Sequence, residues 1–172
     1  SLLDAYKDDI DYRMNGTQPS NKTGYKFNFT ELDNGIVFKD DNLTVEAFKV
    51  NHGEFEDAYG FRFTSKDKVI VFSGDTGPSK SLESYAKDAD ILVHEVYSYA
   101  GFLKKTKDWQ IYHKGHHTST YEVGEIASRA KPKLLVLSHI LFWGADEQDI
   151  LEETRTTFSG KIKIAEDLMV IE

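Results

Sequence analysis

The sequence after Asp75 alternates between short apolar runs and longer amphipathic segments, and this alternation limits the possible folds more than any other feature. Helical spacing is found at residues 79–89, 119–130 and 146–158. Runs with the length of strands lie between and after them, at residues 91–96, 133–139, 161–165 and 168–172. Pro132 ends one helix just before a buried strand. Such alternation predicts a layered α/β fold.

The first part of the chain has a different pattern. Residues 2–13 are expected to form an amphipathic helix, which the polar residues 15–24 end. Short strand-like runs follow, separated by Asn, Asp and Gly turns. They occupy residues 25–32, 35–40, 43–50, 59–65 and 69–75. We therefore expect an antiparallel meander ahead of the alternating part, within a single domain that spans residues 1–172.

Composition restricts the partners and ligands that we expect. The sequence has 29 Asp and Glu against 21 Lys and Arg, a formal net charge of −8, which leaves no basic surplus to neutralise a phosphate backbone. Nucleic acid is therefore not the favoured partner. The chain has no cysteine, so a metal site must be built from His and carboxylate side chains. No apolar run reaches the roughly 18 residues of a membrane helix, so no membrane partner is expected.

Metal-capable side chains lie at the carboxyl ends of the predicted strands. His52 follows residues 43–50, Asp75 ends residues 69–75, and His139 ends residues 133–139. Because the carboxyl ends of strands can converge at one sheet edge, we expect these side chains to lie together. Two imidazoles and a carboxylate are donors that Zn²⁺, Mn²⁺ or Fe accepts. Each residue alone has an ordinary explanation, such as a helix cap for Asp75, and only the set favours a metal site.

Five further residues are candidates for supporting or catalytic roles. His94 and Glu95 end a buried strand and are expected to orient neighbouring groups. His113, His116 and His117 crowd a Gly-containing segment, predicted as a loop, before the helix at residues 119–130. A loop there can aim an imidazole at a developing negative charge, and the helix dipole assists it. The alternative is a solvated polar loop with one capping role.

Five motifs, taken in order, resemble the metallo-β-lactamase superfamily, and within it the ribonuclease Z and arylsulfatase or phosphodiesterase-like branch. They are NHG…AYGFRF, VIVFSGDT, DILVHE, GHHTSTYEVGEIA and LLVLSHI, and the resemblance extends from about Gly35 to the carboxyl terminus. It implies an αββα sandwich of the α/β (α+β) class. It also implies a hydrolase with two divalent metal ions, Zn²⁺ first and Mn or Fe as alternatives. A small ester, phosphodiester or sulfate ester is the substrate that we expect.

The resemblance also assigns roles to individual residues. His52 corresponds to the histidine that completes the first metal site, Asp75 to the aspartate that bridges both metals, and His139 to the terminal histidine of the second site. His117 falls on the histidine of the family's His-Ser-Thr loop, which acts on the scissile group, although Thr118 replaces the usual first serine. The supporting His-Glu motif of the family corresponds to His94 and Glu95.

The chain departs from the branch in two ways. The leading signature His-x-His-x-Asp-His is absent from it, so we expect a sandwich that is incomplete at its amino-terminal side. We also expect weak or no metal binding and no activity in this chain alone. The first residue is not Met, so a missing upstream segment would carry any signal peptide, and the cytoplasm is the favoured compartment.

The second departure concerns the substrate. Ribonuclease Z carries a long tRNA-gripping insertion before the Gly-Asp-Thr strand, whereas here residues 63–68 hold only FTSKDK. This difference favours a small-molecule ester over tRNA. Three alternatives remain open: ribonuclease Z-like tRNA processing, a catalytically dead binding module of the same fold, and a single or structural metal ion held by His52, Asp75 and His139. A homodimer is a further expectation from the family.

Overall fold

The computed structural model describes residues 2–17 and 20–171 and divides the chain into two compact units, Ser1–Glu31 and Leu32–Glu172. The first unit contains α1 (Leu2–Ala5) and α2 (Lys7–Asn15), where the sequence predicted one helix. Ion pairs between residues four apart, such as Arg13 with Asp9, support α2, which has no buried residue. The predicted polar stretch includes residues 18 and 19, which lie outside the described residues. The single domain over residues 1–172 stays a prediction.

Residues 25–32 do not form the strand that their alternating pattern predicted. Phe27 and Phe29 within this segment are exposed. A strand is stable only when a neighbouring strand satisfies its backbone N–H and C=O groups. Alternation of aromatic and polar side chains does not supply that neighbour, so the prediction was wrong for this segment.

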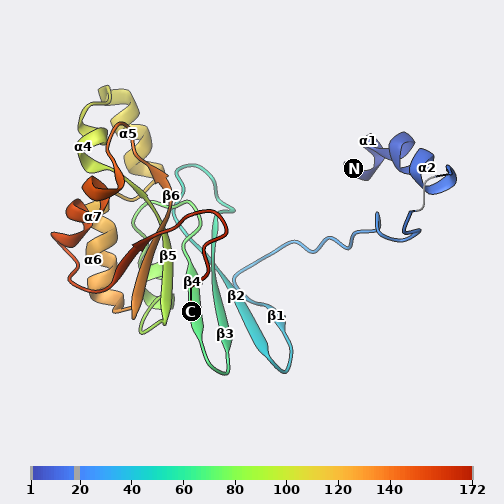
Figure 1. Ribbon diagram of the computed structural model, residues 1–172, viewed down its shortest axis with the longest axis horizontal. Coiled ribbons are helices and arrows are strands. Elements are labelled where there is room, and N and C mark those ends of the chain that lie inside the picture. Colours follow the sequence, from blue (N-terminus) through green and yellow to red (C-terminus); the bar gives the residue numbers. More distant parts are fainter. Residues whose placement is uncertain (1, 18–19, 172) are drawn as a thin grey trace. The chain divides into compact units, whose positions relative to one another are not determined.

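A seven-stranded sheet in the order β1 to β7 forms the centre of the second unit (Figure 1). The strands that pair in antiparallel fashion are β1 (Gly35–Lys39), β2 (Leu43–Lys49), β3 (Tyr59–Ser65) and β4 (Val69–Phe72). Parallel pairing continues from β4 through β5 (Ile91–Tyr97), β6 (Leu134–Leu141) and β7 (Ile162–Ile164). The change from a meander to strand–helix alternation confirms the predicted mixed α/β class.

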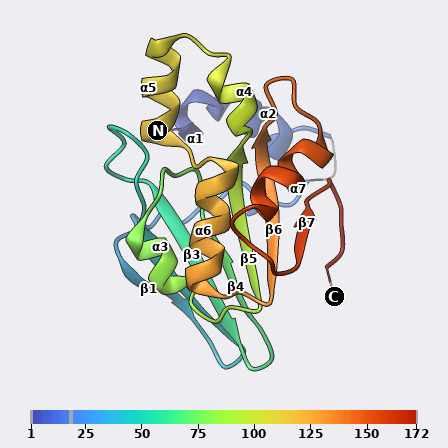
Figure 2. The same ribbon diagram turned by 90° about the vertical axis from the view of Figure 1, so that its left-hand side faces the viewer.

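Three helices connect the parallel strands and cover one face of the sheet. They are α3 (Lys80–Tyr85), α6 (Thr120–Ala130) and α7 (Glu147–Arg155), and Figure 2 shows α3 and α6 in front of the strands. Capping boxes at Ser119 and Asp146 start the last two helices. The core lies between this layer and the sheet. Its fully buried members include Phe48, Val71, Leu92, Leu135, Leu137 and Ile150.

The opposite face of the sheet is also apolar. Phe61 pairs with Phe72 across β3 and β4, and Phe63 pairs with Ile70. These side chains point away from the core because side chains alternate along a strand. Phe72 is exposed, and within residues 32–171 no helix covers this face (Figure 1). The described residues thus supply one sheet and one helix layer of an αββα sandwich.

Two helices were not predicted, and a second predicted strand is absent. The helices are α4 (Tyr99–Leu103) and α5 (Lys107–His116), which lie at one end of the sheet (Figure 2). His113 and His116 therefore belong to a helix, not to the loop that was expected. Residues 168–171 form no strand, and residue 172 lies outside the described residues. Leu168 has a φ of 64°, and this left-handed conformation interrupts an extended chain.

Candidate metal centre

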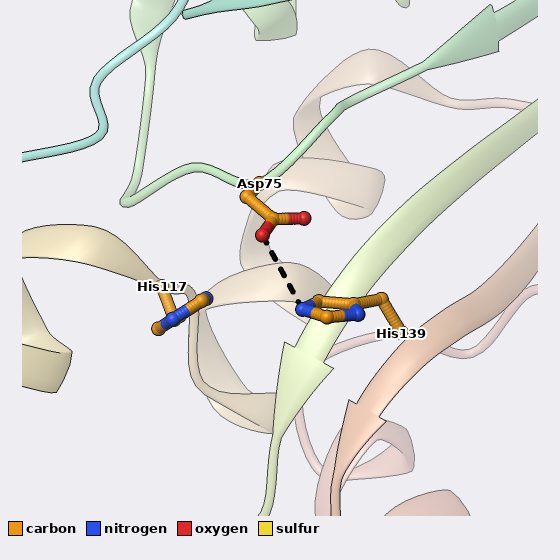
Figure 3. Close-up of side chains that lie close together, drawn as sticks. All are labelled: Asp75, His117 and His139. Carbon is orange, nitrogen blue, oxygen red and sulfur yellow. Dashed lines mark ion pairs between the residues drawn. The ribbon is translucent and has the colours of Figure 1, made fainter. Parts of the chain in front are cut away.

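Three metal-capable side chains converge at one end of the sheet. Asp75 follows β4, His117 follows α5, and His139 lies within β6. One ligand atom from each lies within 4.8 Å of the other two (Figure 3). Nε2 of His139 is 3.3 Å from Oδ2 of Asp75. Imidazole nitrogen and carboxylate oxygen are the donors that Zn²⁺ and similar divalent ions accept, so this trio suits such an ion.

The members of this trio differ in exposure. The side chain of Asp75 is 45% exposed and that of His139 is 52% exposed, whereas His117 is buried. Two of the three donors are therefore open to an ion from solvent. The third is held in the protein interior beside them.

Local backbone geometry orients the side chains of His139 and Asp75. His139 has a φ of 44° and occupies a bulge, because β5 residues Glu95 and Val96 pair with Ser138 and Ile140 and skip it. A bulge re-aims the side chain of the extra residue. Gly74, directly before Asp75, has a φ of 62°, and a Cβ there would lie 2.5 Å from the carbonyl oxygen of Tyr59. Glycine is thus required at this turn.

His52 lies beside the trio. Its ring centroid is 5.5 Å from that of His117, and its Nδ1 is 2.9 Å from the carbonyl oxygen of His116. Because a carbonyl oxygen only accepts, Nδ1 carries the proton and Nε2 keeps its lone pair. His52 can therefore still bind a metal through Nε2. The structure nevertheless groups His117, the expected catalytic residue, with Asp75 and His139, and His52 is not a member of that group.

Glu95 contacts both His117 and the segment that follows it. Oε2 of Glu95 is 3.5 Å from Nδ1 of His117, and neither atom has a hydrogen-bond partner in the described part of the chain. Oε1 accepts hydrogen bonds from the backbone N–H of Thr118 at 2.8 Å and of Thr76 at 3.4 Å. Burial raises the pKa of Glu95, and His117 opposes that rise. Glu95 thus links the backbone beside Asp75 to the backbone beside His117.

His94 lies away from the trio. It follows Leu92 on the helix-covered face of β5, because alternate residues of a strand share a face. Its Nδ1 donates to the carbonyl oxygen of Glu95 at 2.6 Å. Complete burial lowers the pKa of His94 to about 4. Its Nε2 has no hydrogen-bond partner among the described residues. A supporting role for His94 stays a prediction.

Helix α5 contributes ring contacts that the sequence reasoning missed. The His116 ring stacks on Tyr112 with centroids 4.1 Å apart and meets the His52 ring edge-on at 5.1 Å. Gly53 permits this approach, since a Cβ there would lie 2.0 Å from Nε2 of His116. Rings at positions 109, 112, 113 and 116 have helical spacing, so periodicity could have revealed α5.

Comparison with known proteins defines the class of this protein. Residues 4–140 match the family model described as the beta-lactamase superfamily domain, so the chain belongs to that superfamily. Among its relatives, the ribonuclease Z of Archaeoglobus fulgidus is 38% identical over 108 residues, which cover 62% of this chain and 33% of that protein. The ribonuclease Z of a Mycobacterium species (strain KMS) is 27% identical over 175 residues, which cover 100% of this chain and 61% of that protein. The chain thus spans less than two thirds of these relatives.

Solved structures agree on the fold. The metallo-beta-lactamase fold protein YhfI from Bacillus subtilis has a TM-score of 0.64 at 23% identity, covering 78% of this chain and 52% of that one. Human tRNase Z, short form, has a TM-score of 0.57 at 22% identity, covering 80% of this chain and 46% of that one. At this identity the likeness shows the fold alone. It confirms the metallo-β-lactamase fold that the motifs predicted.

These comparisons overturn one expectation. A small-molecule ester was favoured over nucleic acid, yet relatives that match along the whole chain are named ribonuclease Z. Net charge was a poor guide because it averages over the chain, whereas binding depends on the charge at the binding surface. The missing insertion at residues 63–68 was also given too much weight.

In the described part of the chain, no helix is long and apolar enough to cross a membrane.

Proposed function

We propose that this chain forms part of a metal-dependent ribonuclease that hydrolyses a phosphodiester bond of a tRNA precursor. The convergence of Asp75, His117 and His139 carries the proposal, because it places metal donors beside a buried imidazole. Membership of the superfamily and the names of the ribonuclease Z relatives support this choice of reaction and substrate.

The exposed donors have the simplest role. Asp75 and His139 would hold a divalent ion, with Nε2 of His52 as a further donor, and Zn²⁺ is the ion that we propose first. Two such ions are proposed for the intact protein. A bound divalent ion polarises the phosphodiester and lowers the pKa of a water molecule. Asp75 has two carboxylate oxygens, so it can serve two ions at once.

His117 has a separate proposed role. Its buried ring would sit beside the scissile phosphate and place a proton on the leaving oxygen or stabilise the charge that develops there. Glu95, 3.5 Å away, would hold the ring in place. Because His117 is also within 4.8 Å of the other two donors, a ligand role is the competing assignment.

Cleavage of a labelled precursor tRNA by the natural gene product tests the proposal. We expect cleavage that stops on addition of a chelator and returns when Zn²⁺ or Mn²⁺ is restored. Asp75→Ala should remove it. A generic aryl phosphodiester serves as the comparison substrate. Metal-loaded protein that cleaves the aryl ester and leaves the precursor tRNA intact would contradict the choice of RNA, and a loaded protein that cleaves neither would contradict hydrolysis altogether.

A further inference from the structure

Exposed aromatic rings lead along α5 to the candidate metal centre. Trp109 is 54% exposed and Tyr112 is 44% exposed, and their ring centroids lie 5.6 Å apart. Tyr112 stacks on His116, whose ring lies next to that of His52. The rings therefore form a continuous path from the surface of α5 to one of the residues beside the trio.

A second row of rings reaches the trio itself. The Trp109 ring stacks on His113 at 5.5 Å, and the His113 ring lies 5.8 Å from that of His117. Trp143, from the segment after β6, packs against His113 at 4.4 Å. Both rows start at Trp109. We call Trp109, Tyr112, His113, His116 and Trp143 the ring track.

Core packing does not explain why the outer rings of the track, Trp109 and Tyr112, group on one surface. An indole that stays about half exposed contributes little burial, and exposed aromatic rings grouped on one surface commonly mark a binding site. The inner rings are packed against one another and against the centre. The outer rings therefore have free faces in a position that continues toward the reaction site.

The charge beside the ring track is opposite to that of the whole chain. Residues 104–114, with the sequence KKTKDWQIYHK, contain four lysines and one aspartate, a local charge of +3, whereas the chain carries −8. Lys104, Lys107 and Lys114 are exposed. Nζ of Lys105 lies 4.7 Å above the Trp143 ring. A basic surface interleaved with aromatic rings is complementary to a single strand of nucleic acid, which offers phosphates and stackable bases.

We propose that α5 binds a single-stranded segment of the RNA substrate, with bases stacked on Trp109 and Tyr112 and phosphates close to the lysines of residues 104–114. The inference rests on the proposed function for the identity of the RNA. It identifies α5 as the element that binds the RNA strand and directs it toward the trio.

Tryptophan fluorescence can test the ring track directly, because both tryptophans of the chain, Trp109 and Trp143, belong to it. In a Trp143→Phe background, the emission comes from Trp109 alone. We expect a single-stranded oligouridylate, added without metal, to quench this emission to saturation. Tyr112→Ala in that background should weaken the apparent affinity roughly 10-fold, as for loss of one stacked base. Ile111→Ala is the matched control, since Ile111 is 75% exposed on the same helix and should leave the affinity unchanged.

Other outcomes would overturn the inference. Absence of quenching, or equal effects of Tyr112→Ala and Ile111→Ala, would exclude stacking on the track. Equal quenching by inorganic polyphosphate would reduce the site to charge alone. A change of emission with protein concentration and not with RNA would assign the surface to a second copy of the chain.

Cleavage assays separate this inference from the proposed function. In the natural gene product, we expect the double variant Trp109→Ala/Tyr112→Ala to raise KM for a precursor tRNA at least 10-fold, whereas the control Ile111→Ala should leave this KM unchanged. Unchanged KM with active cleavage would refute the ring track and leave the ribonuclease intact. Quenching by RNA in a protein that cleaves no RNA would support the ring track and refute the ribonuclease.

Discussion

Two pairs, each of one carboxylate and one imidazole, have opposite environments in this protein. Asp75 and His139 are about half exposed, whereas Glu95 and His94 in β5 are almost completely buried. Burial raises the pKa of Glu95 and lowers that of His94 to about 4. The exposed pair is open to a ligand, and the buried pair is bonded to backbone groups. Residue type alone therefore does not separate the two pairs, whereas their exposure does.

The largest effect is expected at the exposed pair. Asp75→Ala in the natural gene product should abolish metal-dependent cleavage, because one carboxylate would serve both ions. The unfolding free energy should change by less than about 0.5 kcal/mol, since the side chain is half exposed. Cleavage of precursor tRNA and chemical unfolding of the same preparation measure the two quantities. Full activity in the variant would contradict the ligand role of Asp75. A large loss of stability would show that Asp75 is a structural residue.

His117 tests whether a buried member of the trio is a ligand or a catalyst. His117→Ala should lower kcat by roughly 10²- to 10³-fold, as for loss of a donor that acts only in the transition state. The metal content should stay unchanged. Measuring the metal content and the turnover of the same preparation distinguishes a ligand from a catalyst. If His117→Ala loses an ion while Asp75→Ala retains both, the two assignments are reversed.

His94 should make the stability of the chain depend on pH. Its pKa is about 4 in the folded state against 6.5 as its ordinary value, so the unfolded chain binds the additional proton between these limits. This stabilisation is complete above pH 6.5 and is lost as pH falls toward 4, by roughly 3 kcal/mol in total. Urea unfolding at a series of pH values measures it.

His94→Gln is the control for this pH dependence. Glutamine keeps a donor for the carbonyl oxygen of Glu95 and does not titrate, so most of the slope between pH 4 and 6.5 should disappear. The raised pKa of Glu95 acts in the opposite direction, because protonation of that group stabilises the folded state as pH falls. An identical slope in the variant would place the titrating group elsewhere.

The smallest effect is expected at Glu95. Glu95→Gln keeps the acceptor for the backbone of Thr118 and removes the charge beside His117. Turnover should fall by about 10- to 100-fold, with the loss in kcat and not in KM, as for a residue that positions another. Stability should stay the same or rise, since a buried carboxylate is replaced by a neutral group. Unaltered kcat would show that Glu95 serves only the backbone.

The strands and the position of Asp75 could be predicted because they depend on local pattern. The apolar runs of β2 to β6 coincide with the predicted segments within a few residues, and Asp75 follows β4 as expected. Residues 25–32 have a similar pattern and form no strand, because pairing depends on a neighbour that local sequence does not specify.

The arrangement of the site depends on long-range geometry that the sequence alone does not contain. His117 and Asp75 are distant in sequence, and their approach depends on α5, which was predicted as a loop because Gly115 and several polar residues interrupt its pattern. The bulge that turns His139 toward Asp75 has no local signal. The substrate class was wrong for a related reason, since one total charge hides the basic segment at residues 104–114.

A titration with Co²⁺ tests most directly whether Asp75 and His139 hold a metal ion. Cobalt accepts the same His and carboxylate donors as zinc and absorbs visible light when these bind it. With cobalt in large excess over the 172-residue chain, we expect a weak visible band that Asp75→Ala and His139→Ala each remove and His94→Gln leaves unchanged. A band that persists in both of the first two variants, or one that His94→Gln alone removes, would contradict a metal centre at Asp75 and His139.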